Sequence, residues 1–131
     1  MAKYKFGKRS RKRLEGVHPD LVKVVEECLH LMDISIIEGV RSVEKQKDYV
    51  KTGASKTMKS KHLTGDALDL SPYPIDMKSK MGIKRHYYMA GMLRGIAHMM
   101  DIKIRSGADW DSDGNITDQT FMDLVHIERI D

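Results

Sequence analysis

Residues 60–70 have the sequence Ser-Lys-His-Leu-Thr-Gly-Asp-Ala-Leu-Asp-Leu. The last four residues alternate, so that Leu68 and Leu70 lie on one face of a predicted β-strand while Asp69 lies on the other. The leucine face suits a core, whereas a carboxylate in a core strand needs a partner because an unpaired buried charge is costly. A polar loop without periodicity precedes the strand and delivers His62. The segment therefore predicts a strand that is apolar on one face and carries a functional acid on the other.

Six other segments have the periodicity of helices or strands. We expect helices over residues 19–32, 43–52 and 84–100, and strands over 34–37, 102–105 and 124–130. Ser42 and Gly53 are typical of the positions just before and just after a helix. The predicted apolar side of the longest helix consists of Tyr88, Met92, Ile96 and Met99. The order of elements predicts an α+β fold with a small antiparallel sheet and about three helices.

The length and composition favour one domain over residues 1–131. A chain of 131 residues is long enough to bury its own core without the help of disulfides or a structural metal. The single cysteine, Cys28, excludes an internal disulfide and is expected to be a buried, inert thiol. No apolar run approaches the roughly 20 residues of a membrane span, and the basic N-terminus lacks the apolar region of a signal peptide. We therefore expect no stable membrane insertion and a protein that is made and retained in the cytoplasm.

The net charge of +4 is unevenly distributed. A basic N-terminal arm, about residues 1–13, carries seven Lys and Arg side chains between residues 3 and 13 and no acid. Residues 107–131 carry seven acidic side chains against one arginine. The arm can recruit a polyanion, whether nucleic acid, anionic lipid or an acidic cell-wall polymer. A solvated tail that aids solubility is an equally good interpretation.

Two histidines and one acid form a candidate metal site. His62, Asp69 and His126 supply two imidazoles and a carboxylate, and Asp123 precedes the second histidine by three residues. Three protein ligands leave the fourth tetrahedral zinc position for water, as in catalytic sites. Alternation over residues 124–130 places His126 and Glu128 on the same strand face. On composition alone, ordinary structural histidines remain the alternative.

A second candidate metal site lies nearer the C-terminus. The side chains of Asp109, Asp111, Asp113 and Asn115, with Gly114, match positions 1, 3, 5, 7 and 6 of a calcium-binding EF-hand loop. Position 12, where a bidentate glutamate is usual, is Thr120 instead. The loop is therefore a candidate calcium site.

Four motifs occur in an order that resembles a known family. Ser60, His62, Gly65, Ala67 and Asp69 match the pattern Ser-x-His-x-x-Gly-x-Ala-x-Asp, and Asp123-Leu124-Val125-His126 matches a downstream acid-x-x-His. Residues 39–42, Gly-Val-Arg-Ser, and residues 107–110, Gly-Ala-Asp-Trp, are the other two. Over residues 15–130 the chain resembles the zinc D-Ala-D-Ala carboxypeptidases, which include vancomycin-resistance peptidases. It is most similar to their phage L-alanyl-D-glutamate endopeptidase branch.

The resemblance implies a Hedgehog/DD-peptidase-like fold and roles for the matching residues. The zinc ligands would be His62, Asp69 and His126. Asp123, where many members carry glutamate, would take the proton from the zinc-bound water. Arg41 would stabilise the oxyanion, and Ser60 would help to orient substrate.

The resemblance also implies a function. The chain would be a phage endolysin that hydrolyses the L-alanyl-D-glutamate bond in peptidoglycan stem peptides and so lyses the host. We expect a monomer without a nucleic-acid partner, held in the host cytoplasm until a separate membrane pore releases it. A D-Ala-D-Ala carboxypeptidase or dipeptidase is the alternative within the family. A zinc-retaining binding module, as in the Hedgehog domain, would not need an acid at position 123, and a nucleic-acid binder would leave all four motifs unexplained.

Overall fold

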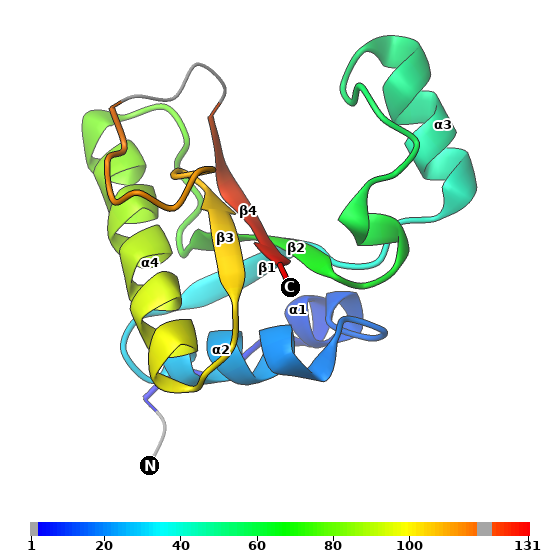
Figure 1. Cartoon of the computed structure of the whole chain (residues 1–131). Helices are drawn as coiled ribbons and strands as arrows, with labels where there is room; N and C mark the ends of the chain where they lie inside the picture. Colours follow the sequence, from blue (N-terminus) through cyan, green and yellow to red (C-terminus); the bar gives the residue numbers. More distant parts are fainter. Residues whose placement is uncertain (1–2, 118–121) are drawn as a thin grey trace.

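The computed structural model describes residues 3–117 and 122–131 (Figure 1). The elements in chain order are α1 (Lys8–Arg13), α2 (Pro19–Leu29), β1 (Ile34–Glu38), α3 (Val43–Thr52), the short 3₁₀-helix η1 (Lys61–Leu63), β2 (Ala67–Pro72), α4 (Lys80–Met99), β3 (Ile104–Gly107) and β4 (Asp123–Arg129). The four strands form one antiparallel sheet in the order β1-β2-β4-β3. The predicted α+β fold class is confirmed.

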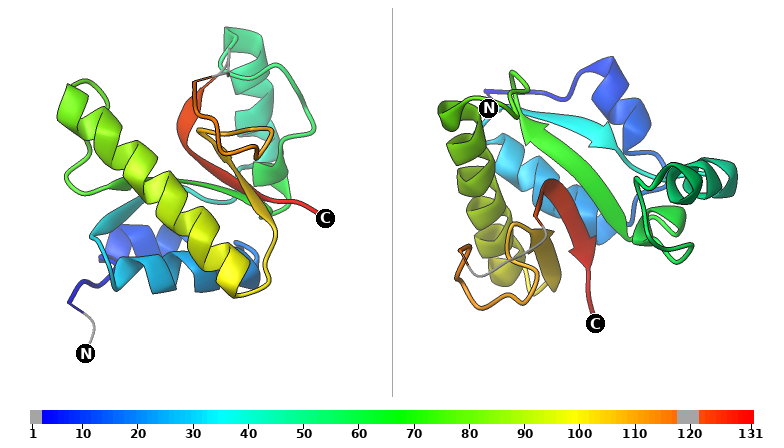
Figure 2. Two further views of the ribbon diagram at one scale, coloured as in Figure 1. Left: turned by 60° about the vertical axis from the view of Figure 1, so that its left-hand side comes forward. Right: turned by 90° about the horizontal axis from the view of Figure 1, so that it is seen from above.

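The predicted face of β2 is the core face. Leu68 and Leu70 are fully buried and join residues of α2 and α4 in the hydrophobic core, together with Ile127 of β4. Figure 2 shows α2 and α4 beside one another against the sheet. Asp69 and its cross-strand partner His126 lie on the opposite face of the sheet, away from this core. The sheet thus separates an apolar layer from a polar one.

The buried side of α4 differs from the prediction. Tyr88 and Met99 are 60% and 84% exposed, while Met92 and Ile96 only border the core. The buried residues are Gly82, His86, Met89, Ala90, Leu93 and Ala97. Met89, Leu93 and Ala97 each follow a residue of the predicted side by one position, so the buried side is rotated about the helix axis from the predicted one. Among the described residues, neither α4 nor another helix is long and apolar enough to cross a membrane.

Helix α1, which the sequence did not predict, covers the outer edge of the sheet. The Ser10 hydroxyl oxygen accepts a hydrogen bond from the Ile36 amide at 3.0 Å, and Arg13 donates to the Ile36 carbonyl at 2.9 Å. These bonds satisfy backbone groups of the edge strand β1 that would otherwise remain open to another chain. Part of the basic arm is therefore an element of the fold.

Helix α3 has the predicted bounds but stands apart from the sheet (Figure 1). The Ser42 side chain accepts a hydrogen bond from the Lys45 amide, as expected for an N-cap. Gly53 has φ +84°, the left-handed conformation that favours glycine after a helix. Gln46 is the buried residue of this helix. Helix α3 and the loop that follows it therefore form a wall beside the polar face of the sheet.

Gly39, at the end of β1, is a position where the backbone needs glycine. A Cβ atom there would lie 2.0 Å from the Arg13 carbonyl oxygen and 2.9 Å from a Val17 methyl group. We predict that Gly39→Ala lowers the free energy of unfolding by about 1–3 kcal/mol, as overpacking does. The matched control is Gly91→Ala in α4, which meets open space and should raise stability by up to about 1 kcal/mol. Urea unfolding measures both, and equal effects of the two substitutions would contradict the prediction.

Candidate metal centre and active site

The structure brings the three predicted metal ligands together. His62 lies on η1, Asp69 on β2 and His126 on β4. Asp69 Oδ1 lies 3.2 Å from His62 Nε2 and 3.2 Å from His126 Nδ1. One ligand atom from each of the three side chains lies within 4.8 Å of the others. The cluster can therefore hold one metal ion.

Local structure fixes the position of each ligand. Asp69 and His126 are direct cross-strand partners, so the register of β2 with β4 places their side chains side by side. His62 is oriented by η1, whose N-cap Ser60 accepts a hydrogen bond from the His62 amide at 3.2 Å. Gly65 turns the chain from η1 into β2 with φ +81°, and a Cβ atom there would lie 2.4 Å from the Gly16 carbonyl oxygen. The Ser-x-His-x-x-Gly spacing thus has a structural reason.

The second nitrogen of each imidazole is held by a protein acceptor. His62 Nδ1 lies 2.8 Å from the Gly39 carbonyl oxygen, and His126 Nε2 lies 2.8 Å from Glu128 Oε1. Metal-binding histidines usually donate their other ring N–H to a carbonyl or carboxylate in this way. Within the described part of the chain, the buried His62 Nε2 atom has no hydrogen-bond partner. An oriented, buried and unsatisfied imidazole nitrogen fits a metal ligand.

The electrostatics of the cluster favour the ionised forms of Asp69 and Glu128. Burial opposes the charge of Asp69, but the His126 hydrogen bond and the nearby His62 imidazole outweigh it and hold the pKa of Asp69 well below its usual range. The same balance lowers the pKa of Glu128 to about 2, because His126 and nearby cations stabilise its charge. Burial, with the Asp69 charge adding to it, raises the pKa of Asp123. Within one site, the pKa values of Asp69 and Glu128 are thus lowered while that of Asp123 is raised.

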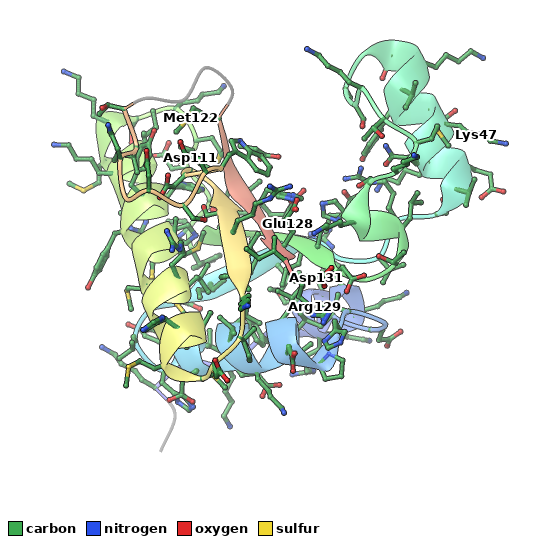
Figure 3. All side chains as sticks on the ribbon, in the orientation of Figure 1. Lys47, Asp111, Met122, Glu128, Arg129 and Asp131 are labelled. Atoms are coloured by element: carbon green, nitrogen blue, oxygen red, sulfur yellow. The ribbon has the colours of Figure 1, made fainter. Side chains whose placement is uncertain are left out.

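The cluster opens into a cavity of about 840 Å³. The sheet side of this cavity is lined by the three candidate ligands together with Asp123, Arg105, Trp110 and Glu128. Helix α3, residues 53–57, Lys59 and Ser60 line the other side. In Figure 3, Glu128 lies on the side of β4 that is turned toward η1 and α3. The cavity therefore gives a substrate access to the metal ligands between the sheet and the α3 wall.

A bulge brings Asp123 into this cavity. Ser106 pairs with Ile127, but the next residue, Gly107, pairs with Asp123, so β4 contains extra residues at this point. Simple alternation would place Asp123 and His126 on opposite faces, whereas both line the cavity. Gly107 permits the close contact, because a Cβ atom there would lie 2.0 Å from the Asp123 carbonyl oxygen. The role of Asp123 as general base remains a prediction.

Arg41 lines the cavity within a network that the sequence did not predict. Its guanidinium donates to Glu38 and, at 2.7 Å, to the side-chain oxygen of Gln46, and it lies 4.5 Å from the centroid of the Tyr49 ring. Lys45 pairs with the same glutamate at 2.7 Å. These contacts fix Arg41 in place, and its role at an oxyanion remains a prediction. Nothing in the sequence identified Gln46, a polar residue in a polar helix.

Glu128 is the main residue of the site without a predicted role. It contacts the candidate ligand His126 and pairs with Arg105 at 2.9 Å and with Lys61 at 3.3 Å. The strand alternation that placed Glu128 on the face of His126 was the available signal. Ser60, for which a substrate contact was predicted, lies at the cavity and caps η1, and its contact with substrate stays a prediction.

The acidic loop brings its aspartates together as well. Asp109, Asp111 and Asp113 each place a carboxylate oxygen within 4.8 Å of the others. Asp109 is buried, and its Oδ2 accepts a hydrogen bond from the Gly114 amide at 2.8 Å, while its Oδ1 has no hydrogen-bond partner in residues 3–117 and 122–131. The side chain of Asn115 accepts from Thr117. Thr120, at position 12 of the predicted calcium loop, lies outside the described residues.

Comparisons with known proteins identify the family of the chain. The family model described as phage L-alanyl-D-glutamate peptidase matches residues 1–130. The chain belongs to the phage L-alanyl-D-glutamate peptidase family. One curated relative, the L-alanyl-D-glutamate peptidase of Escherichia phage T5, is 36% identical over 127 residues, which is 88% of each chain. A solved structure, the L-Ala D-Glu endopeptidase ChiX of Serratia marcescens, matches with a TM-score of 0.77 at 32% identity, over 95% of this chain and 89% of that one.

Membership of this peptidase family confirms the resemblance that the four motifs indicated. It also confirms the prediction of a peptidase, and the ChiX match confirms the expected fold. The comparisons do not assign individual residues. The roles of the site residues in this L-alanyl-D-glutamate peptidase therefore rest on the geometry described above.

The protonation of His126 gives a test of this geometry. Burial opposes its charge, but hydrogen bonds to Asp69 and Glu128 outweigh burial and raise the pKa of His126 from 6.5 to about 9. In metal-free protein, this group should stabilise the fold fully below about pH 6.5, and its contribution should be lost as the pH rises through about 9. An NMR titration of the His126 ring should show the alkaline midpoint.

Glu128→Gln should lower that midpoint, whereas Glu27→Gln, on the exposed side of α2, should leave it unchanged. A wild-type midpoint near 6.5 would contradict the hydrogen-bond geometry at His126.

Proposed function

We propose that residues 1–131 form a single-domain phage endolysin. It hydrolyses the L-alanyl-D-glutamate bond of peptidoglycan stem peptides with the help of zinc, and so degrades the host cell wall. The observation that carries this proposal is that two oriented imidazoles, those of His62 and His126, lie beside the Asp69 carboxylate in a cavity that Asp123 also lines. The names of the phage T5 relative and of ChiX support the choice of bond over D-Ala-D-Ala.

Zinc fits the donor set of His62, Asp69 and His126. Two imidazole nitrogens and one carboxylate oxygen are typical zinc donors, and three protein ligands characterise catalytic rather than structural sites. The hydrogen bonds to Gly39 and Glu128 leave the nitrogens that face Asp69 available to the metal. When bound in such a site, zinc lowers the pKa of water and polarises a substrate carbonyl.

The residues around the ligands supply proton transfer and positive charge. Asp123 takes the proton from the attacking water and passes it to the leaving amine, and its raised pKa brings it closer to the working pH of a general base. Arg41, held by Glu38 and Gln46, provides fixed positive charge for the oxyanion. Ser60, the N-cap of η1, orients substrate in the cavity. These roles follow the positions that match the family motifs.

The cell wall is the proposed partner, and the enzyme acts as a monomer without nucleic acid. We propose that it stays in the host cytoplasm until a separate membrane pore gives it access to the wall. Lys8, Arg9 and Lys12 of α1 are exposed, so they are free to attract an acidic wall polymer.

Removal of the proposed base tests the mechanism. Asp123→Asn should reduce peptide release from purified murein by about 10²-fold or more, the contribution of general base catalysis. Zinc content should remain near that of the wild type, because Asp123 is not a proposed ligand. Mass spectrometry of the products should show new N-terminal D-glutamate, which distinguishes this bond from D-Ala-D-Ala.

The control is Asp48→Asn, on the exposed surface of α3, which should retain full activity. Full activity of Asp123→Asn, or wild-type protein that releases no peptides when loaded with zinc, would contradict the proposal.

We also propose that calcium binds the loop of Asp109, Asp111, Asp113 and Asn115. The buried Asp109 Oδ1 atom, without a hydrogen-bond partner among the described residues, favours a cation there. Because the loop precedes Asp123, binding would order that part of the site. Calorimetry of zinc-loaded protein should show calcium binding that Asp111→Asn weakens, together with a change in activity. No heat and no change in activity would rule out calcium.

A further inference from the structure

Six cationic side chains line the cavity, and they differ in whether they pair with an acidic residue of the protein. They are Arg41, Lys45, Lys56, Lys59, Lys61 and Arg105. On the α3 wall, Arg41 and Lys45 share the carboxylate of Glu38. On the sheet side, Lys61 and Arg105 share the carboxylate of Glu128. The second pair lies next to a candidate metal ligand, because Glu128 also contacts His126 at 2.8 Å.

Arg105 has the geometry of an anion receptor. It lies on β3 directly opposite Glu128 of β4, and its Nε atom is 2.9 Å from Glu128 Oε2. Its guanidinium carbon is 5.6 Å from the centroid of the Trp110 ring. Among the described residues, its Nη1 and Nη2 atoms have no hydrogen-bond partner. The guanidinium is thus held at one nitrogen and against one ring, which leaves two parallel donors for a carboxylate.

Glu128 is more deeply buried than the two cations that pair with it, so the free donors of Arg105 are directed outward. The Glu128 side chain is 8% exposed, whereas those of Arg105 and Lys61 are 41% and 38% exposed. The acid therefore lies beneath the two cations, and one acid balances only one of them. Lys61 is also tied to the Arg129 carbonyl, which keeps its ammonium group beside Arg105. A positive, partly exposed and preorganised surface results at the edge of the candidate metal site.

The proposed substrate carries a matching anion. Glutamate has two carboxyl groups, and a linear stem peptide continues through only one of them. The other remains a free carboxylate close to the scissile bond unless it is amidated. We propose that Arg105, with Lys61 beside it, binds this free carboxylate and selects acid over amide at the D-glutamyl residue. The inference rests on the proposed L-alanyl-D-glutamate activity and adds a specificity-determining subsite to it.

Two synthetic stem tripeptides test the proposal. Both contain N-acetyl-L-alanyl-D-glutamate and differ only in whether the free carboxyl group of glutamate is the acid or the amide. The zinc-loaded wild type should have a kcat/KM at least about tenfold higher for the acid, the factor expected of one charge-assisted hydrogen bond. Arg105→Gln should bring the ratio close to one by lowering the acid rate much more than the amide rate. Lys61→Gln should lower the ratio less.

The matched control is Arg85→Gln, on α4 outside the cavity, which should keep the wild-type ratio. If Arg105 only supported Glu128 and His126, its removal would lower both rates equally, and that result would overturn the proposal. A wild-type ratio near one would overturn it while leaving the proposed function intact. Hydrolysis of neither peptide by a wild type that also fails on murein would overturn the proposed function and this inference with it.

Calorimetry on metal-free protein gives a readout that does not depend on catalysis. The amine-side product, a dipeptide that begins with D-glutamate, should bind wild type at least about tenfold more tightly than Arg105→Gln. The amidated product should bind both proteins alike. Equal affinity of the wild type for the two products would contradict the subsite.

Discussion

The carboxylate of Asp69, held between the imidazoles of His62 and His126, is the interaction on which the site depends. A buried charge is tolerated only when it is paired, so the two histidines and the acid stabilise one another before a metal is considered. The pairing also fixes the register of β2 with β4. A slip of one residue would turn Asp69 toward α2 and α4 and expose the leucines of the core face. Fold and site are therefore specified by the same strand.

An outer set of contacts determines what this cluster can do. The Gly39 carbonyl and the Glu128 carboxylate hold the far nitrogen of each imidazole, which orients both rings toward a common point. Glu128 in turn binds Arg105 and Lys61, so the metal ligands and the proposed carboxylate subsite share one buried acid. On the opposite wall, Glu38 pairs in the same way with two cations, Lys45 of α3 and Arg41, which precedes this helix. Each wall of the cavity thus presents two cations that share one carboxylate.

The sequence predicted those features that have a local cause. Alternation identified the two faces of β2, and residues typical of caps gave both ends of α3. The position of Asp69 followed from the cost of burying an acid.

Features with a nonlocal cause were missed. The bulge in β4 depends on a close approach to Gly107, and α1 has no apolar periodicity because its role is to satisfy the edge of β1. The buried side of α4 was predicted wrongly, because packing against α2 and the sheet selected the adjacent side of the helix with Met89, Leu93 and Ala97. Glu128 shared a face with His126, but only the structure showed their contact.

We propose that His62 Nε2, Asp69 Oδ1 and His126 Nδ1 together bind one catalytic zinc ion. Crystals grown with zinc and measured on both sides of the zinc absorption edge test this claim most directly. We expect one anomalous peak at about 2.0–2.2 Å from all three atoms, with an open fourth position toward the cavity. A zinc-loaded crystal with no peak among these side chains, or with a peak only at the Asp109 loop, would contradict it.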